Sequence, residues 1–402
     1  MVSTSNNSIS LQFQDIPRIA GETICGTVDL NLAQEDHIQA LRIKWRGAIV
    51  TRIRAYDDRR NRNSTIPHRE TIPLIHADQL IWTRGSSFPE PGSHVLSCPF
   101  QFKLPENLPP SFECHAYHRS GTISYSLEVV GERGLFRFNR RIYQVFSVLP
   151  AASQDQVLVA ESLRQGWDGQ WADVKAEERL RQGIWGGYSH AYFTISLPSV
   201  PSIPVYTPIP FSIRITTETK ALTRSERPED KYGKPLFPVP PTEVTITLCR
   251  SAEVRVRRML QFTLRRHVQD TFTLQAHEPQ VVIHEPEWVP KDDKDKGIWR
   301  REVHLTFELL FPFAPTSNTK TIDWMYLLKF LAPFPGIGNN LYIQMPIHLS
   351  PASGCPPPPI GAAGLSSSTY ADNAPAGPPP AMFDLPPSYW AGEEHDWDDE
   401  KK

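Results

Sequence analysis

The sequence predicts an all-β protein with two antiparallel, immunoglobulin-like β-sandwich domains and a disordered proline-rich tail. Three observations lead to this prediction: a high proline content, strand-like alternation of apolar and polar residues, and an abrupt change of composition at Pro351. Proline accounts for 39 of the 402 residues, about twice the usual frequency of about 5%. Because a proline inside a helix removes a hydrogen bond and clashes with the preceding turn, this excess excludes a mainly helical fold.

Residues 1–150 form the first predicted sandwich. Residues 27–32 and 122–129 alternate apolar with polar side chains, which is typical of strands with one packed and one solvated face. The segment 57–69 is charged and polar and is interpreted as a hairpin loop. We expect strands at 9–13, 23–32, 40–54, 71–82, 95–102, 121–130 and 138–148.

Residues 151–190 are interpreted as an interdomain linker with short helical turns. Residues 161–167 (ESLRQGW) and 178–185 (ERLRQGIW) share the sequence Leu-Arg-Gln-Gly, and a glycine after such a segment is a common helix C-terminus. Their tryptophans are expected to pack on the flanking domains; a dedicated binding element is the alternative. Two copies are too few for a repeat architecture.

Residues 191–350 form the second predicted sandwich, interrupted by polar loops at 217–241 and 285–296. The tail, residues 351–402, is rich in Pro, Gly, Ala and Ser and acidic at its end. Such a composition cannot bury enough apolar surface to fold, so we expect an extended chain with polyproline-II character. Strands of the second domain are expected at 191–197, 209–216, 243–248, 253–261, 271–275, 281–283, 302–309, 322–329 and 341–349.

The net charge and the cysteine content exclude several classes of protein. The formal net charge is −2; the tail holds eight acidic residues and two lysines, so it carries −6 and leaves +4 on the rest. That value is too small to indicate a nucleic-acid partner. The five cysteines include no CxxC pair, and neither a signal-peptide-like segment nor a run of 18 apolar residues is seen. These features favour a reduced, cytoplasmic protein.

Catalytic motifs are missing from the sequence. It contains no GxSxG, no HExxH, no P-loop and no GxGxxG that opens a helix. Cys98, Cys114, His115 and His118 offer metal-ligand atoms, but they lack the second paired element that a structural zinc site needs. We therefore interpret them as ordinary structural residues and expect no enzyme activity, no metal and no cofactor.

The tail contains a PPxY motif formed by Leu385, Pro386, Pro387, Ser388 and Tyr389. The two prolines hold the chain in a polyproline-II helix, so little conformational entropy is lost when their rings enter an aromatic groove and the tyrosine fills the neighbouring pocket. WW domains provide such a groove. In a tail of this composition a chance PPxY is expected about 0.08 times, which favours a functional motif over an accident.

The first domain also resembles a known family. The matching segments are residues 20–28 (AGETICGTV), 99–105 (PFQFKLP), 108–112 (LPPSF) and 121–127 (GTISYSL). Two sandwiches with these segments and a PPxY tail resemble the arrestin superfamily, and specifically the α-arrestins, or arrestin-related trafficking adaptors. Less specific similarity lies at 206–215 and 342–347, so the resemblance covers most of residues 8–350.

The resemblance implies an arrestin-type fold and an adaptor function. Such proteins bind a plasma-membrane transporter or receptor as cargo and recruit a WW-domain HECT-type ubiquitin ligase through PPxY, which leads to cargo ubiquitination, endocytosis and sorting. The protein would then be recruited to the plasma membrane or endosomes. One PPxY, where relatives often have more, implies weaker recruitment for lack of avidity. The alternatives are an arrestin-fold vesicle-sorting scaffold that acts without a ligase, and an unrelated β-sandwich enzyme or carbohydrate-binding protein.

A basic stretch in the second domain is the predicted contact for cargo. Arg255 and Arg257 are separated by one apolar residue, so they should share one face of a strand. A solvated strand face is the plain interpretation; a patch for an acidic cargo tail or an anionic lipid is the functional one. The stretch comprises Arg250, Arg255, Arg257, Arg258, Arg265, Arg266 and His267, of which Arg255, Arg257, Arg258, Arg265 and Arg266 are the candidate patch, with a smaller basic group at Arg137, Arg140 and Arg141.

Overall fold

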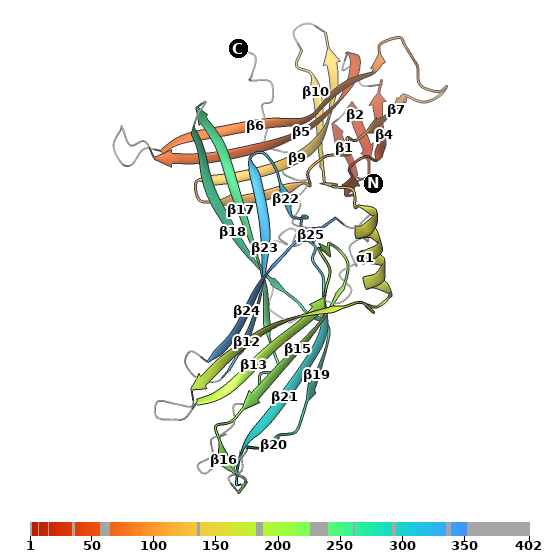
Figure 1. The fold of residues 1–402 in the computed structure, drawn as a ribbon. Helices are drawn as coiled ribbons and strands as arrows, with labels where there is room; N and C mark the ends of the chain where they lie inside the picture. Colours follow the sequence, from red (N-terminus) through yellow and green to blue (C-terminus); the bar gives the residue numbers. More distant parts are fainter. Residues whose placement is uncertain are drawn as a thin grey trace, which may run out of the picture.

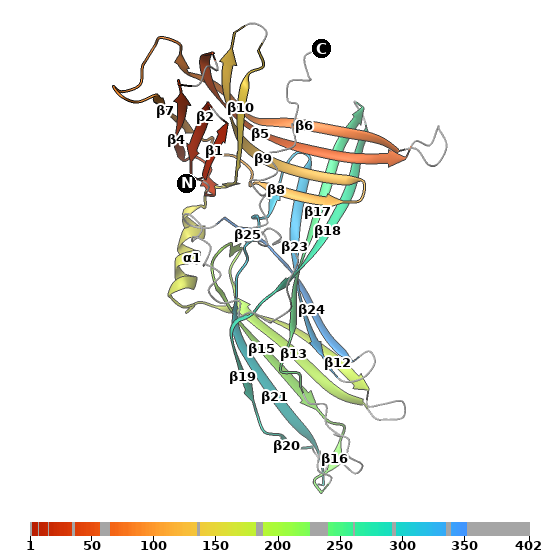
Figure 2. The ribbon, with the colours of Figure 1, turned by 180° about the vertical axis from the view of Figure 1, so that it is seen from behind.

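The protein folds into two β-domains joined through helix α1 (Gln154–Gln165). The computed structural model describes residues 2–6, 8–14, 16–33, 37–56, 65–134, 137–181, 188–225, 240–259, 262–291, 295–334 and 339–351. Figures 1 and 2 view the molecule from opposite sides and show the domains end to end, with α1 beside their junction. The predicted all-β, two-domain fold class is thus confirmed.

The first domain is a sandwich of two antiparallel sheets. The four-stranded sheet has the order β1-β2-β4-β7, and the five-stranded sheet the order β10-β9-β5-β6, with β8 paired to β9. A short parallel pair joins β3 to β11. The strands are β1 (Val2–Asn6), β2 (Ile9–Phe13), β3 (Arg18–Ile19), β4 (Thr23–Asn31), β5 (Ile38–Tyr56), β6 (Thr65–Thr83), β7 (Val95–Lys103), β8 (Phe112–Ala116), β9 (Arg119–Arg133), β10 (Arg140–Phe146) and β11 (Val148–Leu149).

Aromatic side chains from both sheets fill the core of the first domain. The ring of Trp45 lies 4.4 Å from that of Phe102 and 5.5 Å from that of Phe146, both edge-on, the geometry that aromatic pairs prefer. Tyr125 is buried, and its hydroxyl donates a hydrogen bond to the Pro109 carbonyl oxygen at 2.7 Å. The alternation seen in the sequence therefore places one face of each strand in this core.

The second domain is also built from two sheets. The seven-stranded sheet has the order β12-β13-β15-β21-β16, with β19 and β20 also paired to β21; the five-stranded sheet has the order β18-β17-β23-β22, with β24 on β23. The strands are β12 (Trp171–Arg181), β13 (Tyr188–Pro198), β14 (Ile203–Pro204), β15 (Ile209–Glu218), β16 (Leu222–Thr223), β17 (Thr245–Met259), β18 (Phe262–Leu274), β19 (His277–Ile283), β20 (Glu287–Pro290), β21 (Lys296–Leu309), β22 (Ser317–Asn318), β23 (Ile322–Pro333), β24 (Asn340–Ile347) and β25 (Leu349–Ser350), the last paired in parallel with β14.

The core of the second domain again lies between its sheets. The Phe211 ring lies 5.9 Å from the rings of both Phe307 and Phe330. Tyr326 is buried and donates a hydrogen bond from its hydroxyl to the Ala314 carbonyl oxygen at 2.8 Å. Each domain therefore has an aromatic core and a buried tyrosine whose hydroxyl is satisfied by a backbone carbonyl, as buried polar groups require.

The two Leu-Arg-Gln-Gly segments adopt different structures. The first ends α1, which is longer than the expected turn because a capping box between Ser153 and Gln156 begins it. The second segment is predicted to form a helical turn, and for its described part, residues 178–181, this prediction is wrong: these residues lie in β12. The rest of the segment lies outside the described residues. In β12, Leu180 is only 1% exposed and packs in the core, and the backbone pairs with β13 along the whole strand. Tertiary pairing therefore overrides the local helical preference.

Candidate functional site

The five-stranded sheet of the first domain contacts the second domain. In both views the ends of β5, β8 and β9 lie beside β17, β18 and β23 (Figures 1 and 2). At Gly121 on β9, a Cβ atom would come within 2.9 Å of Ile322 Cδ1 on β23. The missing side chain at this glycine thus allows a close approach between the domains.

An aromatic stack forms the centre of this interface. The ring of Phe112 on β8 lies 3.9 Å from that of Trp324 on β23, with 13° between their planes. Both side chains are buried. A stacked pair of this kind adds about 0.5–1.5 kcal/mol to the free energy gained by burying its area, so this contact is expected to be a strong link between the domains.

A buried ion pair lies next to the stack. Arg250 on β17 is 4% exposed and donates to Asp270 Oδ2 on β18, from Nη2 at 2.7 Å and from Nε at 3.1 Å. Its guanidinium carbon lies 4.8 Å from the centre of the Phe112 ring and 5.4 Å from that of Phe272. The charge is therefore held between an aromatic ring from each domain, a favourable cation–π arrangement.

Backbone groups of β17 add two hydrogen bonds between the domains. β17 pairs with β23 only as far as Val254. The backbone edge of the residues that follow on β17 therefore faces the first domain. Thr51 Oγ1 donates to the Arg255 carbonyl oxygen at 2.9 Å, and the Arg257 N–H donates to Glu70 Oε2 at 2.7 Å. These bonds satisfy backbone groups that would otherwise face the interface unpaired.

The interface also changes the chemistry of β8. Burial raises the pKa of the Cys114 thiol to about 12, and burial raises the pKa of Glu113 against the opposing charges of His115 and Arg250. Cys114 is buried whereas His115, its neighbour on the strand, is exposed. Because adjacent residues of a strand point to opposite faces, these two side chains do not converge on one metal.

The predicted basic stretch is partly neutralised. Arg255 Nε donates to Glu253 Oε1 at 2.8 Å, and its Nη2 contacts Asp323 Oδ2. Glu253 Oε1 also lies 3.7 Å from Arg265 Nη1, and Glu253 Oε2 lies 3.9 Å from His267 Nε2. The pKa of Glu253 is lowered, first by the hydrogen bond from Arg255 and further by the neighbouring positive charges, while burial acts in the opposite direction.

The remaining predicted arginines differ in their accessibility. Arg257, Arg265 and Arg266 are exposed, and the Cα atoms of Arg255 and Arg265 are direct partners across the β17–β18 hairpin. The side chain of Arg258 lies outside the described residues. Arg257 and Arg265 therefore lie on the face that carries Glu253, whereas Arg266, whose Cα partner is Val254, lies on the other face. The hairpin does not present a uniformly basic strand face.

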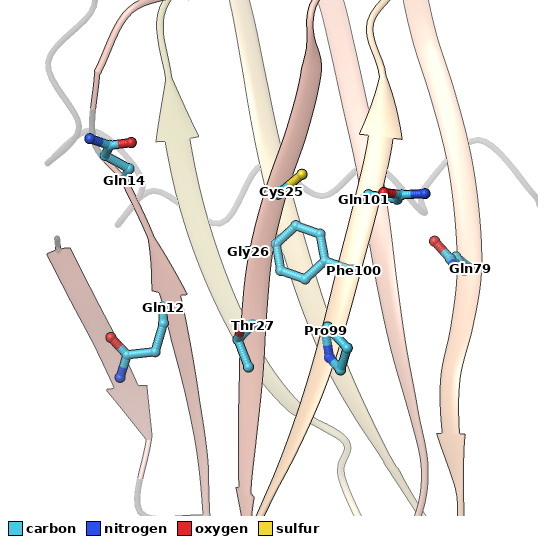
Figure 3. A pocket seen from close by; sticks show the side chains of 9 residues that line it. All are labelled: Gln12, Gln14, Cys25, Gly26, Thr27, Gln79, Pro99, Phe100 and Gln101. Carbon is cyan, nitrogen blue, oxygen red and sulfur yellow. The ribbon is translucent and has the colours of Figure 1, made fainter.

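The predicted WW-binding residues Leu385, Pro386, Pro387 and Tyr389 lie outside the described residues. A depression of about 650 Å³ is present on the first domain, between β2, β4, β6 and β7 (Figure 3). Its lining contains no charged side chain, and the Phe100 ring lies against Gly26, where a Cβ atom would come within 2.4 Å of it. Its lining offers no acid–base pair: Gln12, Gln14, Cys25, Gly26, Thr27, Gln79, Pro99, Phe100 and Gln101.

Arg250 is part of the predicted basic stretch, but the structure buries it at the domain interface, paired with Asp270. The sequence did not single out Trp324. A signal for the burial of Arg250 was present, since Ile246, Leu248, Arg250, Ala252 and Val254 share one face of β17, and the apolar members of this series are buried. A charged residue in the middle of an inward-facing series needs a buried partner. That partner could not be found without the strand register, because Asp270 follows 20 residues later.

Together, the paired sandwiches and the interface between them define a two-domain, all-β protein. Residues 8–154 match the family described as arrestin (or S-antigen), N-terminal domain. This match supports a relation of the first domain to the arrestin superfamily. No curated protein matches the chain. Within the described residues, no helix is long and apolar enough to cross a membrane.

Proposed function

We propose that this protein is an adaptor that binds a membrane transporter or receptor through its arrestin-type domains and recruits a WW-domain HECT-type ubiquitin ligase through PPxY. The observation that carries the proposal is the occurrence of Leu385, Pro386, Pro387 and Tyr389 in the same chain as an arrestin N-terminal domain. The outcome would be ubiquitination, endocytosis and sorting of the cargo. Cargo binding would recruit the adaptor to the plasma membrane or endosomes.

The position of the motif is compatible with this function. β25 ends at Ser350, and 35 residues separate Pro351 from Pro386. A flexible chain of this length spans roughly 30–35 Å. A ligase bound at the motif would therefore stay about one domain diameter from the two sandwiches, close to any cargo that they hold.

The test is a pull-down of the full chain with a panel of WW domains. The wild type is expected to bind at least one domain, and Tyr389→Ala should abolish that binding because the tyrosine pocket is left empty. Tyr370→Ala is the matched control, since it removes the other tail tyrosine from a sequence without PPxY. If no WW domain is captured by the wild type, the ligase-recruiting adaptor is excluded and the sorting scaffold becomes the better interpretation.

For cargo, we propose that the β17–β18 hairpin binds an acidic segment of the cargo tail. The exposed Arg257 and Arg265 lie on the face that also carries Arg255, and complementary charge raises the association rate and selects the partner. Of the other predicted arginines, Arg266 lies on the opposite face of β18, and the side chain of Arg258 lies outside the described residues. Arg255 contributes less charge, because Glu253 and Asp323 are already paired with it.

Charge reversal tests this surface. Arg257→Glu with Arg265→Glu should weaken binding of a fluorescent acidic peptide at least about tenfold at low salt, with a smaller effect at high salt because the charges are screened. Arg84→Glu with Lys103→Glu makes the same change in net charge at exposed positions of the first domain. Equal effects of the two pairs would refute the hairpin site. Binding only to vesicles with anionic lipid would assign the surface to the membrane instead.

A further inference from the structure

Two histidines and a glutamate meet on the seven-stranded sheet of the second domain. Glu302 and His304 are two residues apart on β21 and so lie on the same face. β19 pairs with β21, and the His284 N–H, just after the end of β19, donates to the Glu302 carbonyl oxygen at 3.0 Å. The register therefore places His284 opposite Glu302, and one ligand atom from each of the three side chains lies within 4.8 Å of the others.

The chemistry of these three groups matches a transition-metal site. Two imidazole nitrogens and one carboxylate oxygen form a common ligand set for Zn²⁺, which leaves a fourth position for water or a ligand. The two histidine rings are 5.0 Å apart and inclined by 65°, so they are not stacked face to face. Imidazole ligands distinguish this site from the all-oxygen sites that Mg²⁺ and Ca²⁺ prefer.

The residues around Glu302 hold its carboxylate in place. Thr216 on β15 donates from Oγ1 to Glu302 Oε2 at 3.3 Å. His304 Nε2 contacts Glu302 Oε1, so these two groups of the proposed ligand set already face each other. Arg214 Nε lies 3.4 Å from Glu302 Oε1. Hydrogen bonds to a ligating carboxylate fix its orientation, whereas the Arg214 charge competes with a cation for the same oxygen. Removing Arg214 should therefore strengthen metal binding.

We propose that His284, Glu302 and His304 bind a divalent transition metal ion of the Zn²⁺ class. The ion would link β21 to β19. β19 pairs with β21 at the border of the sheet, and all of its residues are exposed. No motif marks this site in the sequence, because Glu302 follows His284 18 positions later and only the strand register brings them together. β19 and β21 extend away from the first domain (Figure 1), so the site is separate from the interface and independent of ligase recruitment.

Calorimetric titration of the metal-free full chain with ZnCl₂ tests the proposal. His284→Ala and His304→Ala should each lower the affinity of the site at least about tenfold, since even the loss of an outer-shell partner costs 10- to 100-fold. Arg214→Gln should raise the affinity. Zn²⁺ should also raise the melting temperature of the wild type but not of the two histidine variants, and Mg²⁺ should do neither.

Two controls separate this site from other histidines. His190→Ala removes a histidine of the same domain whose Nδ1 lies 3.2 Å from Glu177 Oε1, but which belongs to no group of three ligands in the described part of the chain. His395→Ala removes the histidine of the acidic tail. The proposal is overturned if the wild type does not bind Zn²⁺, or if His284→Ala and His304→Ala bind it as tightly as His190→Ala and His395→Ala do.

Discussion

Phe112→Ala is expected to lower the free energy of unfolding by about 3–5 kcal/mol, the usual cost of deleting a buried phenylalanine ring. The loss should also loosen the contact between the two domains, because the Phe112 ring stacks on Trp324 and covers the guanidinium of Arg250. Urea denaturation measures the first effect. The rate at which a thiol reagent modifies Cys114, followed by mass spectrometry, measures the second, since this thiol is buried and its pKa is raised to about 12.

The control for this prediction is Phe146→Ala. Phe146 is similarly buried but packs against Phe13, Trp45 and Tyr125 inside the first domain. It should cost comparable stability without accelerating the modification of Cys114 under native conditions. A double variant with Trp324→Ala should show less than additive destabilisation, because both single variants break the same stack. Additive effects together with an unchanged Cys114 rate would contradict the interface described here.

Arg250→Met is expected to destabilise the protein by about 3 kcal/mol. Removing one partner of a buried ion pair costs about 3–5 kcal/mol, because the other charge stays behind without compensation; the lower end applies here, since the Asp270 side chain remains 26% exposed. The variant also loses the guanidinium between Phe112 and Phe272. Urea denaturation of the full chain measures the change.

Two further variants make this prediction specific. Arg265→Met removes an arginine of the same hairpin that is 66% exposed and lies 3.7 Å from Glu253, so its effect should stay within about 0.5 kcal/mol. Combining Arg250→Met with Asp270→Leu should restore part of the lost stability, because an apolar pair can replace a buried ion pair at little cost. An Arg250→Met variant as stable as Arg265→Met would show that the pair does not hold the interface.

The interface bears on the proposed function through the position of the hairpin. β17 is bound to the first domain by its backbone at Arg255 and Arg257 and by the side chain of Arg250. The exposed arginines that follow are consequently held at a fixed place beside the first domain. A cargo segment bound there would contact a surface to which both domains contribute, and weakening the interface should weaken that binding as well.

Much of the fold follows from local patterns in the sequence. The alternation at 27–32 and 122–129 predicted β4 and β9, and the glycine at position 166 predicted the end of α1. β17 joins the two predicted strands at 243–248 and 253–261 into one, and β18 begins before the strand predicted at 271–275, because the charged residues between 250 and 267 interrupt the apolar pattern. The helical turn predicted at 178–185 is wrong for residues 178–181, whose local pattern suits a helix but whose pairing with β13 makes them a strand.

The sequence by itself determined the β class, the two domains, the resemblance of the first domain to arrestins and the PPxY motif, because alternation, proline content and short linear motifs are local properties of a chain. Only the tertiary structure showed that Arg250 meets Phe112 between the domains, that Glu253 and Asp323 neutralise Arg255, and that His284 stands opposite Glu302. These contacts join residues distant in sequence, and they depend on strand register and on the packing of sheets.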